Sequence, residues 1–523
     1  MTNRKDMTGA DALLAALADE GVTVCFANPG TTELDLVRSL EREERMRCVV
    51  GLQENVCTGG ADGYGRMTGQ PAATLLHLGP GFANGIANLH NARRAHTPIV
   101  NLIGDHTSWH LPYDAPLTSD IESLARPVSG WVHRIAAVEQ SDAAGREAVK
   151  QSLARGGQGA TLIFPADHQA HTGGEQTALV QTGTSAAAEA PAAFDPAAAV
   201  QRLKAASRIV FLLGGGGDQS GLGARAQKAV QRLCANLGAT AYAETFPSRS
   251  ERGQGLPAFD RLPYFPEPAR EVLDPADLVV LVGALPPVTY FGYEGHPSLL
   301  VQAERLLTLA AVGDDAATRL EQVAGLLGAA EVALPPAVLN PPEEGPLTPA
   351  RIALALANEL PERAIVSVEG GTCGYPFYAV SAAARPHTAL TNTGGAIGQG
   401  LPVAMGAAIA CPDRQVVALL SDGSTQYTIQ TLWSLAHEHL DVVVLIAANH
   451  QYAILRNELR RGGAALGDRA AQITSLDNPR IDWVTLAQSY GVPGGRASTS
   501  GELTALLQQA FGRRGPTLIE MAL

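Results

Sequence analysis

The strongest constraint on the fold is a repeated pattern of short apolar runs, each followed by a turn and then by a helical pattern. The runs are continuous rather than alternating in polarity, and β-branched residues are frequent in them. Strands of this kind are buried on both faces, which is typical of parallel sheets covered by helices. The runs are VTVCFANPG, AATLLHLG, IVNLIGD, ATLIFPA, RIVFLLGGGG, LVVLVGA, AIVSVEGG, VVALLSDG, VVVLIAANH and TLIEMAL. The pattern therefore predicts an α/β protein.

Two stretches rich in proline, alanine or glycine divide the chain into three blocks. Residues 173–195 and 335–347 are predicted to be linkers, because proline prevents regular structure and holds an extended path. A chain of 523 residues is also too long for one hydrophobic core. We predict three doubly wound parallel-sheet domains, at residues 1–172, 196–334 and 348–523.

Charge and composition exclude several classes of protein. The formal net charge is -13, and the absence of a long basic run argues against nucleic-acid binding. The apolar runs are too short to cross a bilayer, and the N-terminus has no signal-peptide core. The six cysteines are scattered without zinc spacing, as expected of free thiols in a reducing compartment. We expect a cytoplasmic protein that acts on a small molecule.

The stretch LSDGSTQYT (420–428) lies between two predicted strands of one βαβ unit, with a helix expected to start at Ser424. A right-handed crossover brings the ends of both strands to the same edge of the sheet. The Asp422 carboxylate, the Asn449 amide oxygen and the Gln451 carbonyl are hard ligands suited to Mg²⁺ or Ca²⁺. The alternative is a plain turn in which Asp422 caps a helix.

Free amides at a helix N-terminus, here at Gly423 and Ser424, suit a phosphate group. Too few protein ligands are present to fill an octahedron around a metal ion, so phosphate oxygens from a cofactor are expected to complete it.

The whole segment SDGSTQYTIQTLWSLAHEHLDVVVLIAANHQY resembles the thiamine-diphosphate motif, which opens with Gly-Asp-Gly and closes with Asn-Asn in that enzyme family. Ser421 and His450 depart from the motif, and neither change removes a side-chain ligand. The resemblance implies that Asp422, Asn449 and the Gln451 carbonyl hold a Mg²⁺ ion bridging the diphosphate of the cofactor.

The N-terminal block is similar to the same family in three places. LQENVCTGGADGYGRMTG implies that Glu54 hydrogen-bonds to the aminopyrimidine ring and so promotes loss of the thiazolium C2 proton. FANPGTTELDL resembles a substrate loop of benzoylformate decarboxylase and implies that Thr31 binds the substrate carboxylate. LLHLGPGFANG combines the Gly-Pro-Gly of acetolactate synthases with His77, which matches a catalytic histidine of benzoylformate decarboxylase.

In the third block, TNTGGAIGQGLPVAMGAA resembles the family segment that packs against the cofactor. The resemblance implies that Ile397 supports the bent conformation of the two rings, and that the segment after AIVSV lines the diphosphate pocket. The predicted cofactor-binding residues are Glu54, Glu369, Gly371, Thr372, Gly395, Ile397, Gly423, Ser424, Gln451 and Tyr452.

The central block carries RIVFLLGGGG, a weak nucleotide signal, and the corresponding domain binds FAD in acetolactate synthases. The length of the block and the lack of a GxGxxG pattern favour a domain without FAD. A second decarboxylase histidine would fall within 289–297, where Phe291 stands in its place and His296 is nearby. The second acid–base group is therefore left open.

Three functions are compatible with these motifs. The first is a 2-oxo acid decarboxylase resembling benzoylformate decarboxylase, favoured by His77. The alternative is a carboligase resembling acetolactate synthase, favoured by the Gly-Pro-Gly-Phe segment. The third is a catalytically silent cofactor-binding protein, against which the presence of Glu54 argues. In this family the activating glutamate and the Mg²⁺ site come from different subunits, which implies a homodimer at least and favours a homotetramer.

Overall fold

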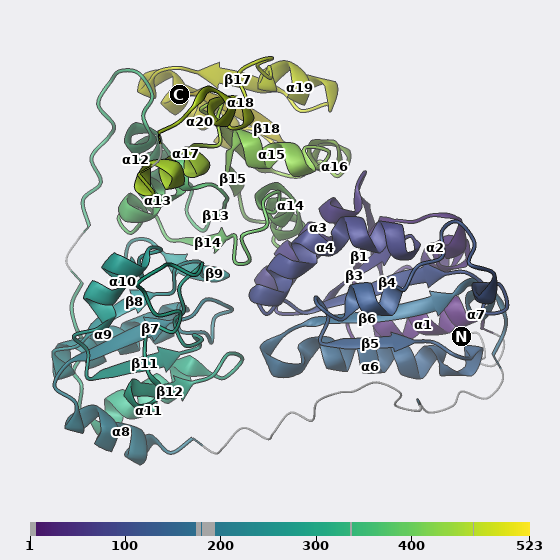
Figure 1. Cartoon of the computed structure of the whole chain (residues 1–523), viewed down its shortest axis with the longest axis horizontal. Coiled ribbons are helices and arrows are strands. Elements are labelled where there is room, and N and C mark those ends of the chain that lie inside the picture. Colours follow the sequence, from purple (N-terminus) through teal and green to yellow (C-terminus); the bar gives the residue numbers. More distant parts are fainter. Residues whose placement is uncertain (1–6, 174–178, 180–193, 335–336, 464) are drawn as a thin grey trace.

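The computed structural model describes residues 7–523 except 174–178, 180–193, 335–336 and 464. It contains three sheets with helices packed against them, arranged as three lobes (Figure 1). The prediction of an α/β protein with three parallel-sheet domains is thus confirmed. The linkers predicted at 173–195 and 335–347 lie partly outside the described residues.

The N-terminal domain contains a six-stranded parallel sheet in the order β2-β1-β3-β4-β6-β5. Cys25 and Ala27 of β1 belong to a core with α1, α2 and α6, whereas Val24 and Phe26 belong to a second core with α3 and α4. Alternate residues therefore face opposite helical layers, which explains the continuous apolar runs. The elements are α1 (Gly9–Asp19), β1 (Val24–Asn28), α2 (Leu34–Arg42), β2 (Arg47–Val50), α3 (Glu54–Thr68), β3 (Ala72–Leu76), α4 (Leu78–Arg94), β4 (Ile99–Asp105), α5 (Ile121–Ala125), β5 (Trp131–Arg134), α6 (Ser141–Leu153), β6 (Gly159–Pro165) and α7 (Ala166–Ala170).

The central domain has a five-stranded parallel sheet in the order β10-β8-β7-β11-β12. Two hydrophobic clusters, one on each face, are built only from residues of this domain. The elements are α8 (Pro196–Ala205), β7 (Ile209–Leu213), α9 (Ala224–Leu237), β8 (Thr240–Ala243), β10 (Asp260–Arg261), α10 (Pro266–Leu273), β11 (Leu278–Val282), β12 (Leu306–Ala310) and α11 (Ala316–Leu326).

The C-terminal domain has a seven-stranded sheet in the order β17-β18-β16-β15-β13-β14-β9. Its last strand, β9 (Arg249–Arg252), comes from the central block and pairs antiparallel with β14, which the sequence did not predict. Pairing with β9 satisfies backbone groups that β14 would otherwise expose at a sheet edge. The other elements are α12 (Pro349–Glu359), β13 (Ile365–Val368), α13 (Gly371–Ser381), β14 (His387–Thr391), α14 (Gly400–Ala410), β15 (Val416–Ser421), α15 (Asp422–Thr425), α16 (Thr431–His437), β16 (Val442–Ala448), α17 (Ala453–Arg461), α18 (Asp468–Ile473), α19 (Trp483–Ser489), β17 (Gly494–Ala497), α20 (Ser500–Phe511) and β18 (Thr517–Ala522).

The outer two domains share one hydrophobic core, because α3 packs directly on α14. Glycines permit this contact: a Cβ at Gly63 would lie 2.1 Å from the Val403 carbonyl oxygen, and one at Gly406 would lie 1.9 Å from the Gly60 carbonyl oxygen. The two helix backbones therefore approach more closely than larger residues would allow.

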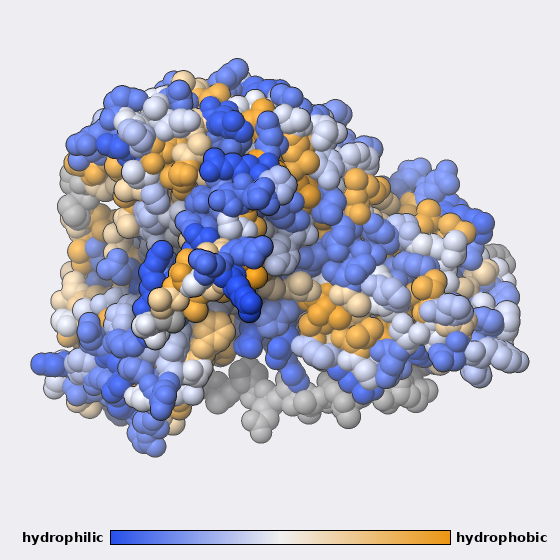
Figure 2. All heavy atoms as spheres, turned by 45° about the horizontal axis from the view of Figure 1, so that its top comes forward, coloured by the Kyte–Doolittle hydropathy of each residue, from blue (hydrophilic) through white to orange (hydrophobic). Residues whose placement is uncertain are grey.

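Two further observations concern the apolar character of the helices and the distribution of hydrophobic residues on the surface. Among the described residues, no helix combines the length and the apolar character that crossing a bilayer requires. Figure 2 shows hydrophobic residues interspersed with hydrophilic ones over the face that it displays.

Candidate active site

The predicted metal ligands follow two neighbouring strands, β15 and β16, which pair in parallel with Ser421 opposite Ala447. Asp422 and Asn449 therefore lie at the same edge of the C-terminal sheet, as predicted. The helix expected to start at Ser424 instead begins at Asp422 and is interrupted by the short turn Gln426–Thr428 before α16. The Asp422 side chain occupies the first turn, because its carboxylate can accept a free amide there.

Asp422 is buried, with 3% of its surface exposed. One carboxylate oxygen accepts a hydrogen bond from the Gly423 amide at 2.8 Å, and the other accepts one from the His450 amide at 2.6 Å. Burial raises the pKa of this carboxyl above its ordinary value. Within the described residues it has no lysine or arginine partner, so a bound cation would supply the missing positive charge.

Asn449 and Gln451 add oxygen atoms to the sheet edge at Asp422, and these three residues together form an oxygen-rich edge. The Asn449 side-chain oxygen accepts from the Gln451 amide at 3.1 Å, and its amide nitrogen donates to the Thr372 hydroxyl at 3.3 Å. His450 between them has a left-handed backbone, with φ of 53°, a strained conformation that directs its amide toward Asp422. In the described part of the chain, no three His, Cys, Asp or Glu side chains cluster to hold a metal. The available donors, one carboxylate with amide and carbonyl oxygens, fit Mg²⁺ or Ca²⁺.

Five other predicted cofactor residues lie near this edge. Gly371 and Thr372 form the first turn of α13, and Thr372 contacts Asn449. Gly423 faces the Tyr452 ring, because a Cβ at this glycine would lie 2.6 Å from a ring carbon. The Ser424 hydroxyl donates to the Ser421 carbonyl at 3.1 Å. The first turn of α13 thus lies beside the Asp422–Asn449 edge. The Gly423 amide, expected to be free for a phosphate, instead donates to the Asp422 carboxylate, because the helix begins at Asp422.

The Glu369 carboxylate stabilises the turn before α14, a role that the sequence did not indicate. Its buried carboxylate accepts hydrogen bonds from the amides of Gly398 and Gly400 at 2.7 and 2.8 Å, at the beginning of α14. Burial raises the pKa of this carboxyl, and the backbone amides oppose the rise. The carboxylate thus fixes the turn before α14, and its predicted contact with the cofactor stays a prediction.

The loop that contains Gly395 and Ile397 is held by hydrogen bonds from its own residue Asn392 and from Asn91 of the N-terminal domain. The Gly395 amide donates to the Asn392 side chain at 2.8 Å, and Gly395 has φ of 77°, which favours glycine. Asn91 of α4 bonds the amide and the carbonyl of Ala396, at 3.1 and 2.8 Å. Ile397 is half-buried next to this clamp. The loop is therefore rigid where the cofactor rings are predicted to bind.

Glu54 lies at the carboxyl edge of the N-terminal sheet, as the first residue of α3. Its carboxylate is half-buried and accepts a hydrogen bond from the Asn84 side chain at 3.1 Å. Gly81 leaves the space between Glu54 and His77, because a Cβ there would lie 3.3 Å from atoms of both. The structure thus brings two predicted catalytic residues to the first turn of α4.

The carboxylate of Glu33, which the sequence analysis did not identify, anchors His77. Glu33 is fully buried, and its Oε2 lies 2.8 Å from Nδ1 of His77 and accepts from the Gly30 amide at 2.8 Å. The contact between Nδ1 and Oε2 fixes the orientation of the His77 ring and leaves Nε2 for other partners. The Gly-x-x-Glu spacing of a helix start was the available sequence signal.

Two local features support a fixed position for His77. A Cβ at Gly30 would lie 2.3 Å from His77 Nδ1, so the close approach requires glycine. Leu78 has φ of 53°, a strained backbone for a branched residue.

Thr31 is exposed, whereas the hydroxyl of Thr32 lies 3.2 Å from His77 Nδ1. Substrate binding by Thr31 therefore stays a prediction.

The Glu33→Gln variant should bind thiamine diphosphate as well as the wild type but turn over roughly 10- to 100-fold more slowly, since His77, the predicted acid–base group, loses its orientation. Steady-state kinetics and the ¹⁵N chemical shifts of the His77 ring check both effects. Asp35→Asn, a change of the same type in α2, should leave both unchanged. Normal kcat in Glu33→Gln would contradict the positioning role of Glu33.

The two sets of predicted site residues lie on different domains of the chain. Among the described residues, no hydrogen bond or ion pair joins Glu54 or His77 to the edge formed by Asp422 and Asn449.

A cavity of about 510 Å³ lies between the N-terminal and central domains, at the carboxyl ends of β7, β11 and β12. Glycine loops at Gly216, Gly283 and Gly313 line it, as does Arg249, which pairs with Asp218 at 2.7 Å. The cavity is where a nucleotide would lie in such a sheet. A central domain without FAD stays a prediction.

Two doubly wound domains, one ending in a glutamate–histidine edge and the other in an oxygen-rich edge at Asp422, define the class of thiamine-diphosphate-dependent enzymes. Comparison with known families supports the same class. Residues 7–124 match the thiamine pyrophosphate enzyme, N-terminal TPP binding domain, and residues 369–521 match the C-terminal TPP binding domain. The chain belongs to the thiamine pyrophosphate enzyme family, within a group of enzymes that act on 2-oxo acids.

Three relatives resemble the chain over almost its full length. A Mycobacterium tuberculosis protein provisionally named acetolactate synthase large subunit IlvX is 45% identical over 98% of this chain and 99% of its own. Benzoylformate decarboxylase of Pseudomonas aeruginosa is 30% identical over 97% of both chains. The structure of Rhodococcus jostii thiamine-diphosphate-dependent 4-hydroxybenzoylformate decarboxylase has a TM-score of 0.82, 25% identity and 99% coverage of both chains.

Proposed function

We propose that the protein is a thiamine-diphosphate- and Mg²⁺-dependent carboligase, which removes CO₂ from a 2-oxo acid and joins the remaining acyl unit to a second carbonyl compound. The observation that carries this proposal is the 45% identity, over 98% of the chain, to the relative named as an acetolactate synthase large subunit. The carboligase was the alternative in the sequence analysis, and the comparisons favour it over the decarboxylase that ranked first there.

In this proposal Asp422, Asn449 and the Gln451 carbonyl hold Mg²⁺, and the amides at the start of α13 bind the diphosphate. When bound, the cofactor supplies a nucleophilic carbon and an acceptor for the electrons left by CO₂. Glu54 hydrogen-bonds to the aminopyrimidine ring. Ile397 supports the rings on the loop that Asn91 clamps.

The second candidate is a simple 2-oxo acid decarboxylase, in which the acyl unit is protonated and released as an aldehyde. The specific observation for it is the His77–Glu33 pair, with 2.8 Å between Nδ1 and Oε2. A histidine oriented by a buried carboxylate can deliver protons at neutral pH. The similarity to benzoylformate decarboxylase of P. aeruginosa supports this candidate also.

We further propose that two chains form each site, in a homodimer or homotetramer. Leu34, Val50 and Leu52 are 48, 41 and 45% exposed in the segments that carry Glu33 and Glu54. Exposed apolar side chains close to a catalytic edge are typical of a surface that another protein covers. The C-terminal domain of a second chain would supply the metal edge that the N-terminal edge lacks.

Product analysis distinguishes the two candidates. The protein is loaded with thiamine diphosphate and Mg²⁺ and incubated with pyruvate or with benzoylformate. We expect CO₂ and an acetohydroxy acid or acyloin from the carboligase. CO₂ with stoichiometric aldehyde would instead support the decarboxylase, and the absence of CO₂ with every 2-oxo acid would contradict both and favour a silent cofactor-binding protein. An apo sample with EDTA serves as the control.

A further inference from the structure

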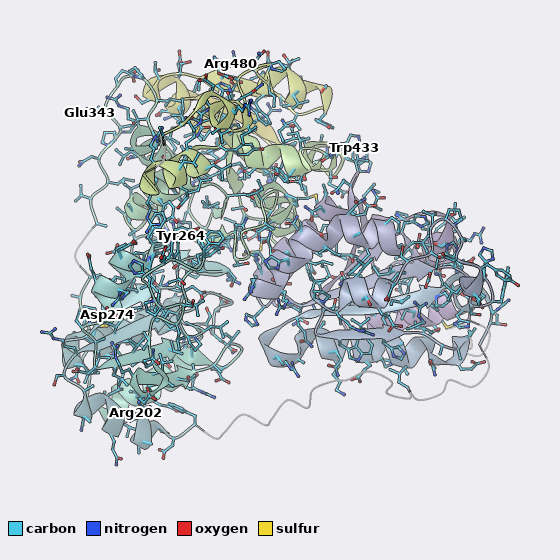
Figure 3. The ribbon with its side chains drawn as sticks, in the orientation of Figure 1. Arg202, Tyr264, Asp274, Glu343, Trp433 and Arg480 are labelled. Carbon is cyan, nitrogen blue, oxygen red and sulfur yellow. The ribbon has the colours of Figure 1, made fainter. Side chains whose placement is uncertain are left out.

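An aromatic cluster of the central domain reaches the loop that is predicted to bind the cofactor rings. Its members are Phe246, Tyr264, Phe265, Tyr290 and Phe291. Figure 3 shows Tyr264 on the side of the central domain that faces the C-terminal domain. The cluster therefore lies where the central domain adjoins the candidate site.

Tyr290 is the member of the cluster that contacts the loop. Its hydroxyl oxygen lies 3.0 Å from the position that a Cβ of Gly395 would occupy. Gly395 precedes Ile397 in the segment that the family uses against the cofactor rings. The hydroxyl is thus located next to the place where chemistry is expected, on the side of the central domain.

The Tyr290 ring is held in a defined orientation. Its centroid lies 5.4 Å from that of Phe246, 5.0 Å from that of Tyr264 and 5.7 Å from that of Phe291. The neighbouring rings meet it edge-on or tilted, arrangements that aromatic pairs prefer. The hydroxyl at its end is consequently presented to Gly395 by a rigid support.

The Tyr290 hydroxyl is also available to donate a hydrogen bond or a proton. Within the described residues it has no hydrogen-bond partner, and 38% of the Tyr290 surface is exposed. Burial raises the pKa of the phenol, Tyr375 of α13 adds to the rise, and Arg94 of α4 opposes it. The Tyr264 hydroxyl is the other titratable group of the packed cluster. At neutral pH the phenol is therefore protonated and can donate.

Two other residues of the 289–297 segment, Phe291 and His296, are less suited to transfer a proton. Phe291, which occupies the place of the decarboxylase histidine in the sequence, has no proton to transfer. His296 lies 3.5 Å from Glu267, which also pairs with Arg461 of α17. In the described part of the chain, no hydrogen bond joins His296 to the Gly395 loop.

We propose that the Tyr290 hydroxyl is the second proton-transfer group of the site and gives its proton to the atom that becomes the new O–H or C–H of the product. The phenol O–H bond breaks as the product bond forms, and the phenolate regains a proton from water at its exposed edge. Over one cycle the charge of the protein is unchanged, and one proton drawn from solvent enters the product for each CO₂ released from the 2-oxo acid anion. This proposal depends on the proposed function, since it assigns a donor for the step after CO₂ release.

The test compares the wild type with Tyr290→Phe and with the matched control Tyr264→Phe, which removes a hydroxyl from the adjacent ring. In Tyr290→Phe we expect kcat for product formation to fall roughly 100-fold, with KM changed less than about three-fold. Calorimetric affinity for thiamine diphosphate with Mg²⁺ should stay at the wild-type value in both variants. Tyr264→Phe should also keep the wild-type kcat.

A second measurement isolates the proton transfer. The dye 2,6-dichlorophenolindophenol takes two electrons from the acyl unit and bypasses the donor. With this dye, CO₂ release by Tyr290→Phe should return toward the wild-type rate. A wild-type kcat, a loss of cofactor affinity or no recovery with the dye in Tyr290→Phe would overturn the role of Tyr290. A wild-type protein that releases no CO₂ from any 2-oxo acid would instead overturn the proposed function.

Discussion

Glu54→Gln is expected to lower kcat by roughly 100- to 10,000-fold, the range over which positioned acid–base groups act. Glutamine has nearly the same size and keeps a hydrogen bond to Asn84, but its amide cannot hold or release the proton that the aminopyrimidine ring requires. Affinity for thiamine diphosphate should change little, because the metal edge lies on another domain. Stopped-flow kinetics and calorimetry on the same preparations measure both quantities.

The matched control for this variant is Glu44→Gln, a change of the same type at an exposed position of the N-terminal domain. It should retain wild-type turnover and thermal stability. If Glu54→Gln keeps turnover within a factor of about three of the control, the activating role of Glu54 is wrong.

Asp422→Asn should abolish metal-dependent cofactor binding. Loss of a group that merely supports a metal ligand costs about 10- to 100-fold in affinity, so removal of the ligand charge should cost more than roughly 100-fold. The amide would in addition direct an N–H group toward the amide of Gly423 or His450, where Asp422 now accepts hydrogen bonds. Isothermal titration with thiamine diphosphate, at several Mg²⁺ concentrations, measures the loss.

Asp468→Asn, at an exposed position of the same domain, is the control and should bind like the wild type. Unchanged cofactor affinity in Asp422→Asn would show that the metal binds elsewhere. Mixing inactive Glu54→Gln and Asp422→Asn chains under exchange conditions tests the shared site: activity should reappear, because some sites then combine an intact Glu54 with an intact Asp422. No recovery in exchanged mixed oligomers would contradict a site built from two chains.

Sequence patterns predicted the strands, and the placement of Asp422 and Asn449 at one sheet edge, because both depend on local order. The continuous apolar runs specify buried parallel strands, and the βαβ connection places Asp422 and Asn449 together. Short or polar strands were missed: β2, for example, is mostly exposed and β10 has two residues. Such strands depend on pairing with neighbours rather than on their own hydrophobicity.

Contacts between distant segments could not be predicted from one sequence. His77 meets Glu33 only because β1 and β3 are adjacent, and β9 leaves the central block to pair with β14. The family resemblance predicts that Glu369 lines the diphosphate pocket, and it gave no sign that the carboxylate also binds amides at the start of α14. Each of these outcomes depends on tertiary packing, which no local motif encodes.

The glycine-lined contact of α3 with α14 has a consequence for cooperativity. Because the outer domains share one core, neither can lose its packing without exposing apolar surface of the other, and the two should melt as a single unit. The central domain has cores of its own and can open at a different temperature. A thermal unfolding curve of this chain would then have two transitions for three domains.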